Sequence, residues 1–405
     1  MEGEIKNFIV VWITVLASLF YCHTIGKFIP KGTTRLFTLL PIISLFLFLH
    51  LNLTTIHLGS ITCFFIAWLA NFKLLLFAFG QGPLSSPSSS SSPPSPHISF
   101  PRFVLIACLP IKIHHHPPPP PNLEKPSKIE IKEYPSHKSP KTVLLRAQNP
   151  ITKPDTTRSA ELGSKGFHKS PLDYATKVVF IAILLRVYKY KEHVHPKLIL
   201  LVYCFHVYVS LELLLALMTV LARAIGQVEL QPPFNEPYRS NSLQDFWGRR
   251  WNLIVASILR PTVYDPVRRI SGRLMGKKWA SVMAIIATFS VSGLMHELVF
   301  YNMGREKPTW EGTWFCVIHG VCLVLEIWVK KALNGKFRLP AIVSGPVVVV
   351  FVVATGSWLF IPAFLRCHAD FRVRREIATF VEFVKEIVGS FGFRSFNVVS
   401  VPHGD

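Results

Sequence analysis

Long uninterrupted runs of apolar residues recur along this chain, and polar segments separate them. A helix needs about 20 apolar residues to cross the hydrocarbon core of a bilayer. The runs are continuous, whereas the strands of a spanning β-barrel alternate in polarity. The pattern therefore predicts an all-α fold, a polytopic bundle of about eight transmembrane helices over residues 8–25, 36–53, 56–79, 172–188, 198–221, 279–301, 313–329 and 342–365.

Prolines interrupt two of these runs. Pro41 lies in the second run, and Pro346 and Pro362 lie in the last. Proline inside a helix removes a hydrogen bond and clashes with the preceding turn, so we expect kinks or breaks at these positions. The composition agrees with a membrane protein, because 17% of the residues are charged, against about 25% in soluble domains, and the mean hydropathy is +0.37.

The segment between the third and fourth runs has a different composition. Residues 85–96 are almost entirely Ser and Pro, and three histidines at 114–116 precede five prolines. Such a segment cannot bury enough apolar surface to fold, so we predict a disordered cytosolic loop. The histidines lack a fourth ligand at a defined spacing, so no metal site is predicted. The chain divides into N-terminal transmembrane helices, this loop, a catalytic core and a C-terminal tail, at residues 1–84, 85–170, 171–368 and 369–405.

The apolar stretch at residues 101–113 is expected to rest on the membrane surface. The net charge of +21 does not indicate a nucleic-acid partner, because the basic residues are spread over the loops between apolar runs, as in membrane proteins that keep Lys and Arg in the cytosol. Alternation over eight spans places residues 26–35, 102–177 and 223–278 in the cytosol and the N-terminus in the lumen. The lysines near residue 190 and the arginines after residue 365 contradict this scheme.

Ionisable residues lie in the run at 279–301, where they are costly and mark functional sites by default. His296 carries an imidazole that can take up a proton near physiological pH. Ser292 and Gly293 share its helical face, and small residues allow a helix or ligand to approach closely. A histidine that is hydrogen-bonded by a neighbouring helix is an equally weighted interpretation. His206 and His319 are rivals in weaker contexts.

A polar and aromatic segment precedes that run, at residues 242–252. Trp247 and Trp251 are four residues apart and Arg249 and Arg250 lie off their face, which is typical of an interfacial helix with its tryptophans at headgroup level. Asn252 has two interpretations. Either its side chain hydrogen-bonds the end of a helix, which is the more common role of an asparagine, or its amide group faces a reacting carbonyl.

Arginines are concentrated in the loop around this segment. They fit contact with lipid headgroups or the capture of a phosphate-rich substrate by the planar guanidinium group. No Walker loop, GxGxxG fingerprint or GxSxG elbow occurs, so nucleotide hydrolysis, dinucleotide binding and serine-hydrolase chemistry have no support.

Several longer motifs resemble those of the plant wax synthase family, a branch of the membrane-bound O-acyltransferase superfamily. They are ELQPPFNEPY at 229–238, SLQDFWGRRWN at 242–252, SGLMHE at 292–297, PTWE at 308–311, HGVC at 319–322, FGQGPL at 79–84 and PIKI at 110–113. The resemblance thus covers most of the chain.

The resemblance implies an enzyme of the endoplasmic reticulum membrane that transfers an acyl group from acyl-CoA to the hydroxyl of a long-chain alcohol or a sterol. No metal or resident cofactor is implied, since acyl-CoA is a co-substrate. The family's intramembrane histidine maps onto His296, and its upstream Asn/His position maps onto Asn252. We expect substrate contacts from Trp247, Trp251, Arg249, Arg250, Glu236 and Ser292. A lipid transporter or a catalytically inactive lipid-binding regulator is the competing interpretation.

Overall fold

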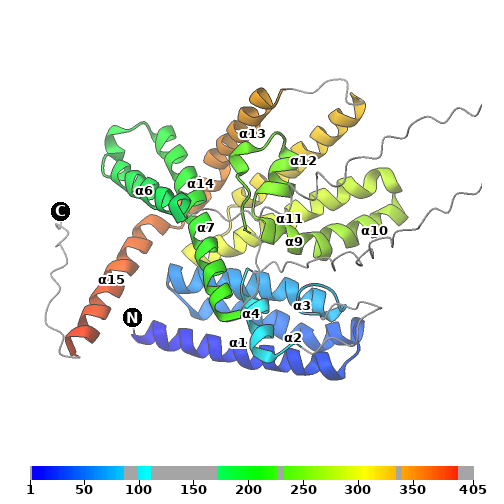
Figure 1. Cartoon of the computed structure of the whole chain (residues 1–405), viewed down its shortest axis with the longest axis horizontal. Coiled ribbons are helices and arrows are strands. Elements are labelled where there is room, and N and C mark those ends of the chain that lie inside the picture. Colours follow the sequence, from blue (N-terminus) through cyan, green and yellow to red (C-terminus); the bar gives the residue numbers. More distant parts are fainter. Residues whose placement is uncertain (1, 86–97, 111–170, 227–231, 334–339, 391–405) are drawn as a thin grey trace, which may run out of the picture.

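The computed structural model describes residues 2–85, 98–110, 171–226, 232–333 and 340–390, and every regular element in these ranges is a helix (Figure 1). The predicted all-α class is confirmed. The Ser/Pro and His/Pro tracts, apart from Ser85, lie outside these ranges. The division of the chain into four regions stays a prediction.

Seven stretches of the described chain are long and apolar enough to cross a membrane. Four are single long helices, namely α1 (Glu2–Phe28), α7 (Pro196–Gly226), α11 (Lys277–Gly304) and α12 (Glu311–Ala332). A fifth, Thr33–Asn52, is α2 (Thr33–Leu49) continued by a short turn. The other two, Ile56–Ala78 and Ala341–Arg366, are built from several helical segments. All seven coincide with predicted runs.

The predicted span at 172–188 forms a helix, α6 (Pro171–Tyr188), but it is not among these seven. It carries Asp173, Lys177 and Arg186 within 18 residues, whereas each of the seven has an 18-residue window with at most two charged residues. Lys177 Nζ donates to Glu212 Oε1 of α7 at 2.7 Å, and this ion pair fastens α6 to its neighbour. A short turn, η4 (Lys191–His193), joins the two helices. By length and composition the described chain therefore has seven of the about eight expected spans, and a crossing by α6 stays a prediction.

Wider helical turns, with π-type hydrogen bonding, interrupt the two composite spans. The third span consists of η2 (Ile56–Ser60), η3 (Cys63–Ala70) and α3 (Asn71–Ala78), and it follows a short turn, η1 (His50–Asn52). The last span consists of α13 (Ala341–Thr355), η8 (Gly356–Phe360) and α14 (Ile361–Arg366). Pro362 begins α14, so the break expected near it is present, while α2 continues as one helix through Pro41.

The first three spans pack side by side, at the bottom of Figure 1, around a common apolar core. The short helix α4 (Phe100–Cys108) completes this core by burying Phe103, Ile106 and Ala107. The expectation that this stretch rests on the membrane surface is therefore wrong. Fully buried Lys73 explains the difference, because its ammonium group donates to the carbonyls of Ile106 and Leu109, at 2.6 Å each, and binds α4 at its C-terminal end.

The remaining helices form a second group in which α11 packs against both α10 (Asp265–Leu274) and α12. A chain of short segments leads into it, namely η5 (Pro237–Arg239), α8 (Leu243–Asp245), η6 (Phe246–Arg250), α9 (Leu253–Leu259) and η7 (Arg260–Tyr264). Helices α11 and α12 touch at Gly293, where a Cβ atom would lie 2.7 Å from the Cα atom of Thr313. Glycine therefore permits a close approach of these two helices.

Four charged side chains bind the turn at residues 54–57, which connects the second span to the third. Glu4 accepts hydrogen bonds from the backbone N–H groups of Thr54 and Thr55, and Glu376 accepts from those of Ile56 and His57. Arg305 and Arg372 donate to neighbouring carbonyls, those of Leu51, Leu53 and Thr54. The last helix, α15 (Ala369–Ser390), is thus bound to the N-terminal spans.

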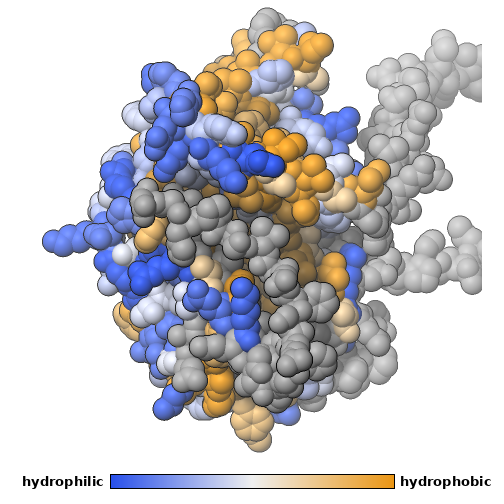
Figure 2. All heavy atoms as spheres, turned by 90° about the vertical axis from the view of Figure 1, so that its left-hand side faces the viewer, coloured by the Kyte–Doolittle hydropathy of each residue, from blue (hydrophilic) through white to orange (hydrophobic). Residues whose placement is uncertain are grey.

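Large apolar side chains remain exposed on the spans. Ile13, Phe37 and Trp314, for example, are more than half exposed, at 60%, 71% and 58%. On the face shown in Figure 2, hydrophobic residues lie at the surface beside hydrophilic ones. Such surface is unfavourable in water and is expected where helices contact lipid.

Candidate active site

The His296 ring lies among aromatic side chains from three parts of the fold. Phe360 of η8 meets it edge-on, with ring centroids 5.0 Å apart, and Trp68 of η3 and Phe300 of α11 lie at 6.5 and 6.3 Å. Two of these neighbours come from π-type turns, which occur frequently at functional sites. Among the described residues, no hydrogen bond to either ring nitrogen of His296 is present.

The rival His319 is held in a different way. It is fully buried, and its Nδ1 atom accepts from the Trp247 indole N–H at 3.1 Å, while Nε2 lies 2.8 Å from the Thr355 hydroxyl. An indole nitrogen can only donate, so the proton of a neutral His319 sits on Nε2 and is directed to Thr355. Both nitrogens are used, and His319 is structural. His206 also has a partner, since its Nδ1 atom lies 2.9 Å from the Tyr188 hydroxyl.

Glu297, the neighbour of His296, binds the start of the next helix. It is 5% exposed, and its Oε1 atom accepts from the backbone N–H of Thr313 at 3.1 Å. The first N–H groups of a helix lack partners within it, so a carboxylate there stabilises α12. This bond fixes α11 against α12 one residue away from His296, whose own ring has no such contact.

Asn252 occupies a left-handed backbone position, with φ of 37°, at the start of α9. Its Oδ1 atom accepts a hydrogen bond from the Val255 N–H at 3.3 Å, which caps the helix. Of the two arrangements expected for Asn252, the structure contains the hydrogen bond to a helix end. Val255 in turn packs on the apolar cluster that contains Trp68, so Asn252 and His296 adjoin the same cluster.

The two tryptophans before Asn252 pack against side chains of other helices. Trp247 is in edge contact with Phe289 and His319, and Trp251 stacks on Phe246 and on Tyr208 of α7. The depth of this segment relative to the headgroup layer stays a prediction. The tryptophans join the segment to α7, α11 and α12, and they set the position at which α9 begins.

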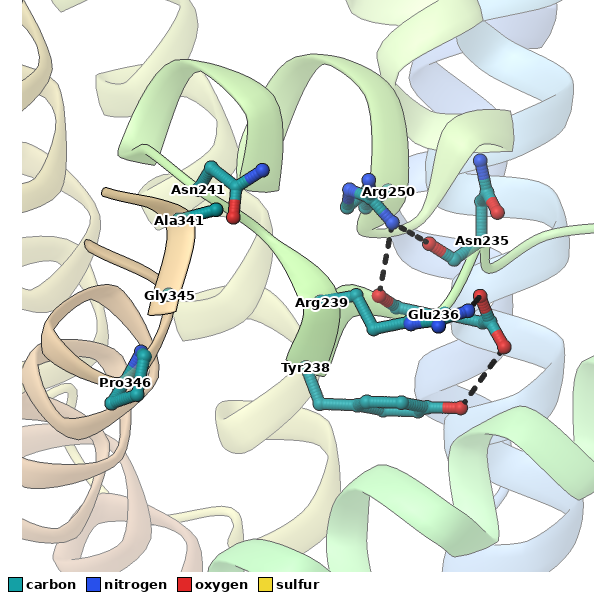
Figure 3. A pocket seen from close by; sticks show the side chains of 9 residues that line it. All are labelled: Asn235, Glu236, Tyr238, Arg239, Asn241, Arg250, Ala341, Gly345 and Pro346. Carbon is teal, nitrogen blue, oxygen red and sulfur yellow. Dashed lines mark hydrogen bonds and ion pairs between the residues drawn. The ribbon is translucent and has the colours of Figure 1, made fainter. Parts of the chain in front are cut away.

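Pocket residues Arg250 and Glu236 make hydrogen bonds within their own loop. Arg250 donates to Asp245 at 2.6 Å and to the carbonyls of Asn235 and Glu236. The Glu236 carboxylate accepts from Arg239 and from the Tyr238 hydroxyl (Figure 3). Its hydrogen bond to Arg239 raises the pKa of that guanidinium above its ordinary value.

These groups line a polar pocket of about 550 Å³. One wall is the loop with Asn235, Glu236 and Arg250, and the other is the first turns of α13, with Ala341 and Gly345 (Figure 3). Arg249 is exposed and is not part of this wall. Ser292 is half-buried on α11, the helix that packs against α12.

Three participants were not singled out from the sequence. Trp68 and Phe360 contact His296, but single aromatic residues in apolar runs give no signal of function. Glu212 is 2% exposed within α7, where it binds Lys177 one turn away from Tyr208, which stacks on Trp251. A glutamate inside the run at 198–221 was the available signal, because an acid there needs a partner.

The chain matches known acyltransferases over most of its length. Residues 230–317, which include Asn252 and His296, match the family described as "Membrane bound O-acyl transferase family". An "Acyl-CoA--sterol O-acyltransferase 1" of Arabidopsis thaliana is 40% identical over 381 residues, which are 94% of this chain and 97% of that protein. A "Long-chain-alcohol O-fatty-acyltransferase" of Simmondsia chinensis is 40% identical over 395 residues, which are 97% and 99% of the two chains.

These matches confirm the resemblance that the motifs indicated. The two relatives cover the three spans that meet at His296, the capped helix after Asn252 and the pocket loop. This chain of seven candidate membrane spans belongs to the membrane-bound O-acyltransferase family, in its branch of long-chain-alcohol and sterol O-acyltransferases.

Proposed function

We propose that this protein esterifies the hydroxyl of a long-chain alcohol or a sterol with an acyl group from acyl-CoA, in the membrane of the endoplasmic reticulum. The observation that carries the proposal is the imidazole of His296. It is the intramembrane histidine of the matched region, and its nitrogens bind no other described residue, whereas those of His319 are both used.

In this reaction His296 acts as the general base. It takes the proton of the acceptor hydroxyl as the oxygen attacks the thioester carbonyl. A new C–O bond forms and the C–S bond breaks, and the proton passes from the imidazolium to the departing CoA sulfur. The products are the ester and CoA-SH, and His296 is neutral again. General base catalysis contributes typically 10²- to 10⁴-fold.

The polar pocket supports recognition of the CoA moiety. Arg239 and Arg250 line it, beside amide groups of Asn235 and Asn241, and the planar guanidinium group suits phosphate. Its second wall is the start of α13, at the end of the molecule where Lys277, Lys330 and Lys331 begin α11 and end α12. This basic end fits a cytosolic orientation, and acyl-CoA is soluble in the cytosol. Of the predicted substrate contacts, Glu236 and Arg250 belong to this pocket, while Trp247, Trp251 and Ser292 support its surroundings.

The first experiment is an assay on microsomes from cells that lack sterol and wax esterification. Labelled acyl-CoA is supplied with fatty alcohols or with sterols, and His296→Ala is compared with His193→Ala, a change of an exposed histidine in the turn before α7. We expect ester from the unchanged chain and from the control, and a loss of 10²-fold or more for His296→Ala. Full activity of a correctly inserted His296→Ala protein would refute the base assignment.

A second pair of variants separates the two roles of Asn252. Aspartate keeps the oxygen that caps α9 but lacks an amide donor, whereas alanine lacks both and is strained at a φ of 37°. If Asn252 acts as a cap, Asn252→Asp retains most of the turnover and Asn252→Ala does not. Equal loss in both variants would assign the amide to the developing carbonyl charge, where such a donor contributes about 3–4 kcal/mol.

A further inference from the structure

Trp68 has a buried indole N–H group without a hydrogen-bond partner in the described chain. The side chain is 6% exposed and lies in an apolar cluster with Phe65, Leu69 and Ile258. Burying an unpaired donor costs about 1–3 kcal/mol, so such a group calls for an explanation. The side chains of this cluster are apolar and offer no acceptor to the indole.

The position of this donor relates it to the proposed base. Trp68 and His296 lie edge to face, with ring centroids 6.5 Å apart. An oxygen that accepts from one ring nitrogen and donates to another makes two contacts of about 2.8–3.0 Å. Two rings with centroids 6.5 Å apart leave room for such a bridging oxygen. His296 has an imidazole without a partner in the described chain, so a donor and an acceptor are adjacent and both unsatisfied.

We infer that Trp68 positions the acceptor: its indole N–H donates to the oxygen of the acceptor hydroxyl while that hydroxyl directs its proton to His296. This inference rests on the proposed function. A hydroxyl satisfies both groups at once because its oxygen accepts and its hydrogen donates. The apolar body of the acceptor then lies along the apolar cluster around Trp68.

This contact gives the site a preference that packing alone does not provide. A site built to hydrogen-bond an oxygen discriminates against an analogue that cannot accept, because the buried donor is then left unpaired. Sulfur is a weak acceptor. The enzyme should therefore prefer an alcohol over the corresponding thiol through Trp68, although a thiol is the better nucleophile.

The test compares Trp68→Phe with Trp12→Phe. Phenylalanine keeps an aromatic ring and removes the N–H group. Trp12 on α1 is a matched control, since its indole N–H is also buried without a partner but its ring is not in contact with His296. We expect Trp68→Phe to lower kcat/KM for the acceptor about 10- to 100-fold with the KM for acyl-CoA unchanged. The rate ratio between the acceptor and its thiol analogue should fall by a similar factor, and Trp12→Phe should change neither value.

Two results would overturn the inference. One is an unchanged alcohol-to-thiol rate ratio in Trp68→Phe. A loss of folded protein lowers both rates equally and does not change this ratio, so only a fall in the ratio reports the loss of the contact. The other needs no variant: in the unchanged enzyme, the methyl ether of the acceptor should inhibit more strongly than the alkane of equal length, since the ether oxygen accepts from Trp68. Equal inhibition contradicts the contact. Failure of the proposed function is separate, because it appears as full activity of His296→Ala.

Discussion

At the scale of single residues, His319 joins three helices through its two ring nitrogens, which bind Trp247 and Thr355. We predict that His319→Phe leaves the Trp247 N–H unpaired and lowers the free energy of unfolding by about 1–3 kcal/mol. His319→Asn, whose amide oxygen can accept from Trp247, should lose less. The midpoint of thermal unfolding in detergent measures both variants.

Equal midpoints for the two variants would show that the hydrogen bond from Trp247 contributes little. Activity is the second measurement, because Trp247 belongs to the segment that positions Asn252. A His319→Asn protein that is as stable as the unchanged chain but inactive would give His319 a role in the reaction, contrary to its position in the fold.

Residue types were easier to predict than residue roles. Ionisable groups inside an apolar run indicated His296, and the motif at 242–252 indicated Asn252 and Arg250. The bonds that occupy Asn252 and Arg250 depend on backbone geometry, such as the left-handed φ of 37° that directs Asn252 to cap α9. Trp68 was beyond prediction, because its interest lies in the absence of a partner for its N–H group in the described fold, and no sequence records that.

At the scale of elements, helix α4 depends on Lys73 of α3. We predict that Lys73→Met, which has nearly the same shape, leaves the carbonyls of Ile106 and Leu109 unpaired in a buried place and releases α4. Protease sensitivity near residue 100 should rise, and stability should fall by about 1–3 kcal/mol for each carbonyl left bare. Lys331→Met, a change of an exposed lysine, is the control. Unchanged protection of α4 would contradict the prediction.

Helix α15 is bound through a carboxylate whose pKa is shifted. Burial raises the pKa of Glu376, but hydrogen bonds from the His57 side chain and from the N–H groups of Ile56 and His57 outweigh it, and the net pKa lies below the ordinary value of 4.5. Because the pKa of Glu376 is lowered in the folded protein, the stabilisation by its carboxylate is complete above pH 4.5. It is lost as the pH falls through the shifted pKa.

We therefore predict that α15 stays bound at neutral pH and loosens in acid, below about pH 4.5. Hydrogen exchange at the N–H groups of Ile56 and His57, corrected for the intrinsic effect of pH, should accelerate there. Glu376→Gln should show this acceleration at neutral pH already. Protection that is equal in the variant and the unchanged chain at pH 7 would show that the carboxylate does not hold the helix.

Hydropathy predicted the helical elements well and their interruptions poorly. Seven of the eight predicted runs coincide with candidate spans, because the cost of exposing backbone polar groups in lipid leaves helices as the solution for such runs. The π-type turns η3 and η8 depend on local hydrogen-bond geometry, which a window of average hydropathy does not contain. Helix α6 lies on the remaining run, and an average over that run conceals its three charged residues.

At the scale of the whole molecule, the ends of the spans are sorted by charge. The start of α1, the end of α2, the end of α11 and the start of α15 all meet at the turn of residues 54–57. A helix of 28 residues such as α11 is about 42 Å long, so Lys277 and Lys278 lie at the opposite end. With Lys330 and Lys331 they form a basic end that fits the cytosolic side.

We predict this orientation from those contacts and test it by labelling. Lys278→Cys and Thr309→Cys place thiols at exposed positions at opposite ends of α11. In sealed microsomes, whose outer surface is cytosolic, a thiol reagent that does not cross membranes should label the first variant. The second should react only after permeabilisation, and the unchanged chain reports the background. The reverse pattern would invert the topology.

The turn at residues 54–57 also has a consequence for biosynthesis. Its N–H groups at Ile56 and His57 find their acceptor in a residue that is synthesised 319 to 320 positions later. At about 5–20 residues per second, roughly 15–60 s of translation separate the two partners. During that interval the second and third spans are already synthesised, but the N–H groups of Ile56 and His57 in the turn between them lack their acceptor, Glu376. The N-terminal spans therefore reach their final state only once Glu376 has been synthesised, and a premature stop before α15 damages the part of the protein that was made first.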